Sequence, residues 1–101
     1  MENALSFLST TDAEYAEWCG QVMRSEFMLE AAESTAYAML EGSVEDRKRA
    51  AKLADPVKAA QENHIQAVVG RERLRAQRKR AELTIEVWRS MNANRRMGNV
   101  T

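Results

Sequence analysis

The fold of this chain is decided by residues 60–88, which read AQENHIQAVVGRERLRAQRKRAELTIEVW. Every seventh residue from position 60 is apolar, and a companion series of the same period starts four residues later. Steps of three and four place both series on one face of an α-helix, as in a coiled coil. We call this face the C-terminal seam. Its members are Ala60, His64, Ala67, Arg71, Leu74, Arg78, Ala81, Ile85 and Trp88.

An earlier stretch has the same spacing and predicts a second long helix, with Ser25 as the one interruption of the series. No segment shows the strict apolar–polar alternation that is typical of a strand. Two long helices with apolar faces predict an all-α fold in which these faces pack together. The N-terminal seam consists of Tyr15, Trp18, Val22, Leu29, Ala32, Ala36 and Met39.

Local signals predict the helix boundaries within a single helical domain, residues 1–101. The sequence Thr11-Asp12-Ala13-Glu14 matches a capping box, so we expect a tail over 1–11 and a helix over 12–41. Gly42 would end that helix in the left-handed conformation. Gly20 lies inside it and weakens it by about 1 kcal/mol relative to alanine.

Two more helices are expected after Gly42. Ser43 can cap a short helix over 44–54, and Asp55-Pro56 is a typical helix start. The third helix is predicted over 56–92, with Gly70 as a candidate kink and a frayed tail over 93–101. A continuous helix from 44 to 91, bent at Pro56, is the main alternative.

The charges of the chain are sorted along it. Residues 1–42 hold eight acidic residues and one basic residue, whereas residues 56–101 hold ten basic and four acidic residues. The net charge is zero. This asymmetry indicates that the chain folds back on itself or pairs with a copy of itself.

The helical positions of these charges favour antiparallel packing. At 100° per residue, an acidic rail flanks the N-terminal seam and a basic rail flanks the C-terminal seam. The two rails meet only if the helices are antiparallel. If Glu30 faces Arg75, the turn region spans about 42–60. The acidic rail is Glu26, Glu30, Glu33 and Glu41, and the basic rail is Arg71, Arg75, Arg78 and Lys79.

Two alanine-rich helices bury little apolar surface, and a single helix pair is marginally stable. Large apolar residues such as Phe27 and Met28 have no predicted partner within the pair. We therefore expect a homo-oligomer, most simply an antiparallel dimer that forms a four-helix bundle.

Residues 71–80 carry six basic residues in ten. One interpretation is contact with nucleic-acid phosphates; the other is pairing with the acidic rail. The basic residues wrap around the helix, which argues against a single groove-reading face. The expected contacts with an acidic partner are the cations outside the rail, with an aromatic anchor: Arg73, Arg80, Arg89, Arg95, Arg96 and Trp88.

The sequence offers no catalytic, metal-binding or cofactor-binding motif. His64 is the only histidine and Cys19 the only cysteine, and neither has partners at the spacing of a metal site or a nucleophile–base pair. We expect both to be structural residues and the protein to be no enzyme. We expect neither a membrane span nor a secretion signal, and hence a cytoplasmic protein.

One stretch of the chain runs from Arg71-Glu72 through IEVWRSMNANRR, residues 85–96. This stretch resembles small helical proteins of unknown function that tailed bacteriophages and prophages encode near replication and recombination genes. The resemblance covers roughly a quarter of the chain. It implies an accessory role in the host cytoplasm and carries over no catalytic residue.

Three functional hypotheses follow. The first is a non-enzymatic phage accessory protein that acts through protein–protein contact, as an adapter or inhibitor of a host or phage DNA-processing machine. The alternative is a DNA- or RNA-binding accessory of phage replication or recombination that uses the basic run 71–80. The third is a structural component of the virion.

Overall fold

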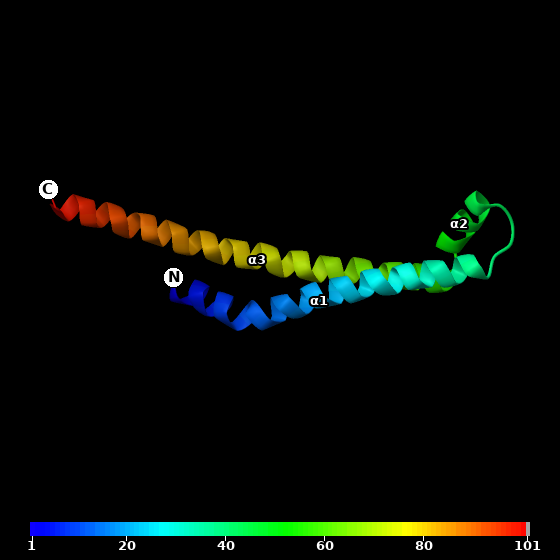
Figure 1. The fold of residues 1–101 in the computed structure, drawn as a ribbon. Coiled ribbons are helices and arrows are strands. Elements are labelled where there is room, and N and C mark those ends of the chain that lie inside the picture. Colours follow the sequence, from blue (N-terminus) through cyan, green and yellow to red (C-terminus); the bar gives the residue numbers. More distant parts are fainter. Residues whose placement is uncertain (101) are drawn as a thin grey trace. The chain divides into compact units, whose positions relative to one another are not determined.

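The chain forms three helices in a computed structural model, which describes the backbone of residues 1–100 and the side chains of residues 1–97. These are α1 (Glu2–Ala38), α2 (Val44–Lys52) and α3 (Asp55–Val100). Residues 1–100 contain no strand. The long helices α1 and α3 pack as a hairpin with α2 as a short bridge (Figure 1), which confirms the predicted fold class.

Two compact units divide the chain. Unit 1 comprises Met1–Ala16 and Glu72–Thr101, and unit 2 comprises Glu17–Arg71. Each unit pairs a part of α1 with a part of α3, and unit 2 also contains α2.

Helix α1 begins ten residues earlier than the capping box predicts. Thr11 lies inside the helix, where its hydroxyl donates a hydrogen bond to the Phe7 carbonyl at 2.6 Å. The Thr10 hydroxyl does the same to the Ser6 carbonyl at 2.8 Å. A threonine hydroxyl can bond to the backbone four residues back as readily as it caps a helix. The predicted tail over 1–11 is therefore wrong.

The end of α1 and the start of α2 follow local signals more closely. Gly42 has the predicted left-handed backbone, with φ of 118°, although α1 ends at Ala38 rather than at Glu41. Ser43 caps α2 as predicted: its side chain accepts a hydrogen bond from the Asp46 N–H at 3.2 Å. Helix α2 stops at Lys52, two residues before the predicted 54.

Helix α3 starts at Asp55, and residues 53–54 separate it from α2, so the alternative of one continuous helix is wrong. At its other end α3 continues to Val100. The predicted helix end at 92 is therefore wrong, and so is the predicted frayed tail over 93–100. Residue 101 of that tail lies outside the described residues. Asparagine costs a helix only some tenths of a kcal/mol, and the alanine and arginines beside Asn92 and Asn94 favour it.

The two seams form the interface within each unit. The most deeply buried apolar side chain is Val57, at 1% exposure. The others lie at seam positions, apart from Ala51 in α2: Val22, Ala67, Leu74, Ala81 and Ile85. Two predicted seam members do not belong to it, because Met39 is 81% and Trp88 43% exposed. The steps of three and four also continue towards the N-terminus, from Tyr15 through the buried Thr11 to the half-buried Leu8.

The polar interruptions of the two seams meet in unit 2. The Ser25 hydroxyl lies 2.9 Å from Nδ1 of His64, and it also donates a hydrogen bond to the Val22 carbonyl at 3.0 Å. Because a hydroxyl has one hydrogen to donate, we assign Nδ1 of His64 as the donor to Ser25. His64 is thus a satisfied structural residue of the interface.

Gly70 permits a close approach in unit 2. A Cβ atom at this position would lie 2.4 Å from the ring of Trp18, a distance that no real side chain tolerates. The indole of α1 therefore packs directly against the backbone of α3. The sequence singled out Gly70 as a kink, whereas its clearest role is to make room for Trp18.

The contacts set a register that differs from the predicted one. Tyr15 lies opposite Arg75 in unit 1, and Ser25 lies opposite His64 in unit 2. The predicted pairing of Glu30 with Arg75, and the turn over 42–60 that it required, are therefore wrong. The first turn of α3 already packs, as the burial of Val57 shows, so the turn is confined to residues 39–54.

Helix α2 supplies basic neighbours for the acidic rail. Glu33 lines a hollow together with Lys48 and Lys52 of α2. Next to it, Arg47 donates a hydrogen bond to the Tyr37 carbonyl at 3.0 Å, and its guanidinium stacks 4.1 Å from the centroid of the Tyr37 ring. Arg47 thus satisfies one of the last carbonyls of α1.

Candidate functional site

Arg78 fastens the start of α1 to α3 in unit 1. Its Nη1 donates to the Leu8 carbonyl at 3.0 Å and to the Thr11 hydroxyl at 2.7 Å. Its Nη2 donates to Oδ1 of Asp12 at 2.6 Å, and the Arg78 side chain is only 17% exposed. The guanidinium also lies 5.4 Å from the centroid of the Tyr15 ring. We call this set of contacts the Arg78 clamp.

The clamp coincides with a bend in α1. Figure 1 shows the helix changing direction within its blue part, where the Thr10 and Thr11 hydroxyls bond to carbonyls of the preceding turn. Such hydroxyl bonds, and a side chain that engages helical carbonyls, are known causes of helix bending.

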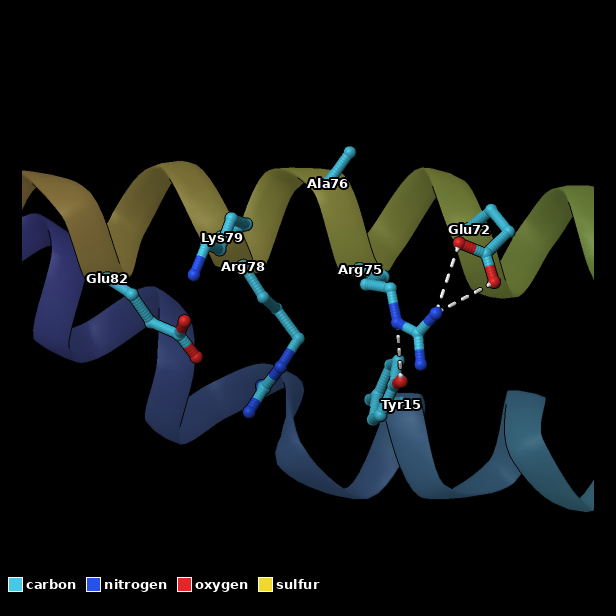
Figure 2. Close-up of a pocket in the computed structure, with 7 residues that line it drawn as sticks. All are labelled: Tyr15, Glu72, Arg75, Ala76, Arg78, Lys79 and Glu82. Carbon is cyan, nitrogen blue, oxygen red and sulfur yellow. Dashed lines mark hydrogen bonds and ion pairs between the residues drawn. The ribbon is translucent and has the colours of Figure 1, made fainter.

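A shallow hollow of about 520 Å³ lies beside the clamp. Figure 2 shows Arg75 and Arg78 reaching from α3 towards α1, while Ala76 points away. Nε of Arg75 donates to the Tyr15 hydroxyl at 3.3 Å, and Nη1 donates to Glu72 at 3.3 Å. The hydrogen bond to Tyr15, followed by the negative charge of Glu72, raises the pKa of Arg75 above its ordinary value.

The charges around this hollow are largely compensated. Arg75 pairs with Glu72, and Arg78 pairs with Asp12. Glu82 adds another carboxylate to the lining. Of the run 71–80, Arg78 is thus used inside the fold and the exposed Arg75 is paired at its surface, so the hollow is a structural contact rather than an anion-binding pocket.

The predicted contact residues all lie on the surface. Arg73 and Arg80 are exposed on α3, and so are the four residues nearer its end. In the register of unit 1, Met1 lies near residue 88, so α3 continues past the start of α1. This is visible in Figure 1, where the N label stands well short of the C label. We call residues 87–97 the C-terminal segment.

The C-terminal segment combines exposed apolar and basic side chains. Its large apolar residues are between 43% and 71% exposed, and its charged residues are three arginines. No acidic residue occurs from position 87 to 101. The exposed apolar residues are Val87, Trp88, Met91 and Met97, and the arginines are Arg89, Arg95 and Arg96.

The face of this segment continues the C-terminal seam. At 100° per residue, Trp88 and the three arginines lie within about 60° of the direction in which Leu74, Ala81 and Ile85 face α1. Along residues 89–97 no part of α1 lies against this face in the described structure.

Sequence reasoning missed the Arg78 clamp and the docking of α2. The signal for the clamp is the seam spacing, because Leu8 and Thr11 extend the steps of three and four that lead to Tyr15. The signal for α2 is its own composition, in which Arg47 to Lys52 are basic or alanine and can face the acidic part of α1.

The described residues contain no cluster of three or more side chains that could hold a metal ion. None of the helices among these residues is long and apolar enough to cross a membrane. Cys19 is a half-buried free thiol. Comparison with known proteins gives no match to a family model, to a curated protein or to a solved structure.

Proposed function

We propose that this protein is a non-enzymatic interaction protein whose C-terminal segment docks onto an acidic helical surface of a protein partner. The observation that carries the proposal is the continuation of the seam beyond α1, where Trp88 is exposed beside Arg89, Arg95 and Arg96. Tryptophan and arginine are the side chains that most often dominate binding energy at protein interfaces.

The charge distribution supports the choice of an acidic partner. Three arginines in a segment without acidic residues attract a surface of opposite charge and speed its encounter, and Trp88 offers the large contact area of an anchor. Arg73 and Arg80 extend the positive surface along α3. The resemblance of residues 71–96 to phage proteins suggests the setting of this role: an adapter or inhibitor of a DNA-processing machine in a host cytoplasm.

Nucleic-acid binding by the run 71–80 is the alternative. It is less favoured because Arg75 and Arg78 are engaged in hydrogen bonds with α1, although Arg73, Lys79 and Arg80 are exposed. Such binding would fall steeply as salt rises.

Photo-crosslinking tests the proposal. A photoreactive amino acid at position 91 of the full chain is expected to capture a protein from host lysate, and the adduct should survive nuclease treatment. The same probe at position 23 is the matched control, because Met23 is a methionine in the other unit that is more exposed than Met91, at 71% against 55%. It should capture no such adduct.

Charge reversal provides the second half of this test. The triple variant Arg89→Glu/Arg95→Glu/Arg96→Glu should weaken capture by more than about tenfold, which corresponds to 1.4 kcal/mol. Arg73→Glu/Arg80→Glu should weaken it too, with the helical circular dichroism unchanged. Nuclease-sensitive adducts would favour the alternative, and equal capture at positions 23 and 91 would refute the proposed surface.

A further inference from the structure

A groove with a single charged side chain runs along one face of unit 2. It consists of two adjoining hollows of about 720 Å³ and 700 Å³ that share Met28, Ala32 and Pro56. Of the twenty residues that line them, eight are alanines and one, Arg24, is charged. In a chain with 30% charged residues, so long a surface with one charge is unusual.

Large apolar side chains project beside the alanines that line this groove. Met28 is 62%, Met39 81% and Leu53 68% exposed, and all three line the groove. The same face therefore carries both protruding side chains and the shallow depressions into which such side chains fit. An exposed apolar surface of this extent on a soluble domain is typical of an interaction site.

We propose that the groove is the face through which two copies of this chain associate, groove to groove, as a two-fold symmetric four-helix bundle. A two-fold interface uses the same patch on both molecules and must be self-complementary. Projections and depressions on one face meet this requirement. The near absence of charge means that two copies can meet without repulsion.

The C-terminal segment, a second exposed apolar surface, fits a second copy less well. The C-terminal segment carries three arginines and no acidic residue, so two such segments would repel each other. The groove and the basic segment thus suit different partners: a copy of the chain and an acidic protein. The proposal on the groove does not depend on the proposed function.

The face that contains the groove reaches the lower size limit of a specific dimer interface. From Trp18 to Met39 it follows α1 for about 32 Å at 1.5 Å per residue, and two adjacent helices present a width of roughly 20 Å. Each copy would then contribute on the order of 600 Å², and the pair reaches the ~1,200 Å² at which specific stable interfaces begin.

Unit 2 also needs additional burial. Its buried apolar side chains among the described residues are Val22, Ala51, Val57 and Ala67. These side chains are small, and a core of this kind stabilises a helix pair little. A second copy would cover Met28 and Met39 and supply the missing apolar contacts.

Light scattering with size-exclusion chromatography tests the proposal on the full chain. The native protein should have twice the chain mass of 11.4 kDa at micromolar concentration, and Met28→Glu/Met39→Glu should have the monomer mass. The matched control is Met23→Glu/Phe27→Glu, at two positions that are each 71% exposed and outside the groove. This control should remain a dimer.

A cross-link decides the case in which the groove variant fails to fold. With Cys19→Ser as background, Met28→Cys should give a covalent dimer with a short bismaleimide, whereas Met23→Cys should give none. A native protein of monomer mass, or loss of the dimer in the control alone, would overturn the proposal. Equal cross-linking at both positions would do the same.

Discussion

The substitution Gly70→Ala is expected to lower the free energy of unfolding by about 2 kcal/mol, although alanine is the better helix former. The intrinsic gain is about 1 kcal/mol. Against it, the new Cβ would lie 2.4 Å from the Trp18 ring. The indole must then leave its place against α3, which costs more than the gain in propensity because large buried contacts are lost.

Gly20→Ala is the matched control for this effect. Gly20 also lies inside a long helix, but a Cβ there would meet only the end of the Arg24 side chain, at 3.2 Å. A flexible side chain can move, so Gly20→Ala should stabilise the protein by about 1 kcal/mol. Denaturant unfolding at one fixed protein concentration measures both changes.

A double-mutant cycle identifies the cause. In a Trp18→Ala background the clash is absent, so Gly70→Ala should become stabilising by its helix propensity. A destabilisation by Gly70→Ala that is the same with and without Trp18 would contradict the proposed contact.

Replacing Arg78 by methionine is expected to release the start of α1. The variant loses hydrogen bonds to the Leu8 carbonyl, the Thr11 hydroxyl and the Asp12 carboxylate. Hydrogen bonds of a charged group contribute about 1.5–3 kcal/mol. Because Asp12 is 69% exposed and can be hydrated again, we expect a total loss of about 2–3 kcal/mol.

Hydrogen exchange distinguishes this release from a general loss of stability. The amides of residues 5–12 should lose protection more than those of residues 60–67, since the clamp acts on unit 1. Arg80→Met is the control, because Arg80 is exposed on the same helix and should change stability by no more than ~0.5 kcal/mol. Equal effects of the two substitutions would mean that the clamp does not stabilise the fold.

The sequence predicted those parts of the fold that rest on burial. The seam spacing identified the two long helices and the faces on which Val22, Ala67 and Leu74 are buried. Each such side chain contributes more to stability than an exposed ion pair does. The pattern of buried residues is therefore the strongest signal in this chain.

The register could not be predicted from the charged rails. An exposed ion pair contributes about 0.2–1 kcal/mol, which is too little to oppose the burial of Val57, Leu74 and Ile85 in their present positions. The acidic rail lies partly beside α2 instead, as Glu33 shows. The order of charges along the chain thus predicted the antiparallel direction of the two helices correctly, but it predicted the wrong register between them.

The candidate site was predicted in part. The exposure of Arg73, Arg80 and the arginines after Trp88 agrees with the sequence interpretation. That Trp88 lies beyond α1 could not be foreseen, because it depends on the register and on the extra turns of α1. The hydroxyl of Thr11 is compatible both with a position at a helix cap and with a position inside a helix. The hydrogen bond from Arg78 favours the position inside the helix.

The central claim is the register that leaves the C-terminal segment of α3 beyond α1. Thiol cross-linking in a Cys19→Ser background tests it most directly, with products separated by mass so that links within one chain are counted. The pair Tyr15→Cys/Arg75→Cys should cross-link with a short bismaleimide, because Tyr15 and Arg75 are in contact. Efficient linking of Glu30→Cys with Arg75→Cys, and none between positions 15 and 75, would contradict the register and place α1 opposite Trp88.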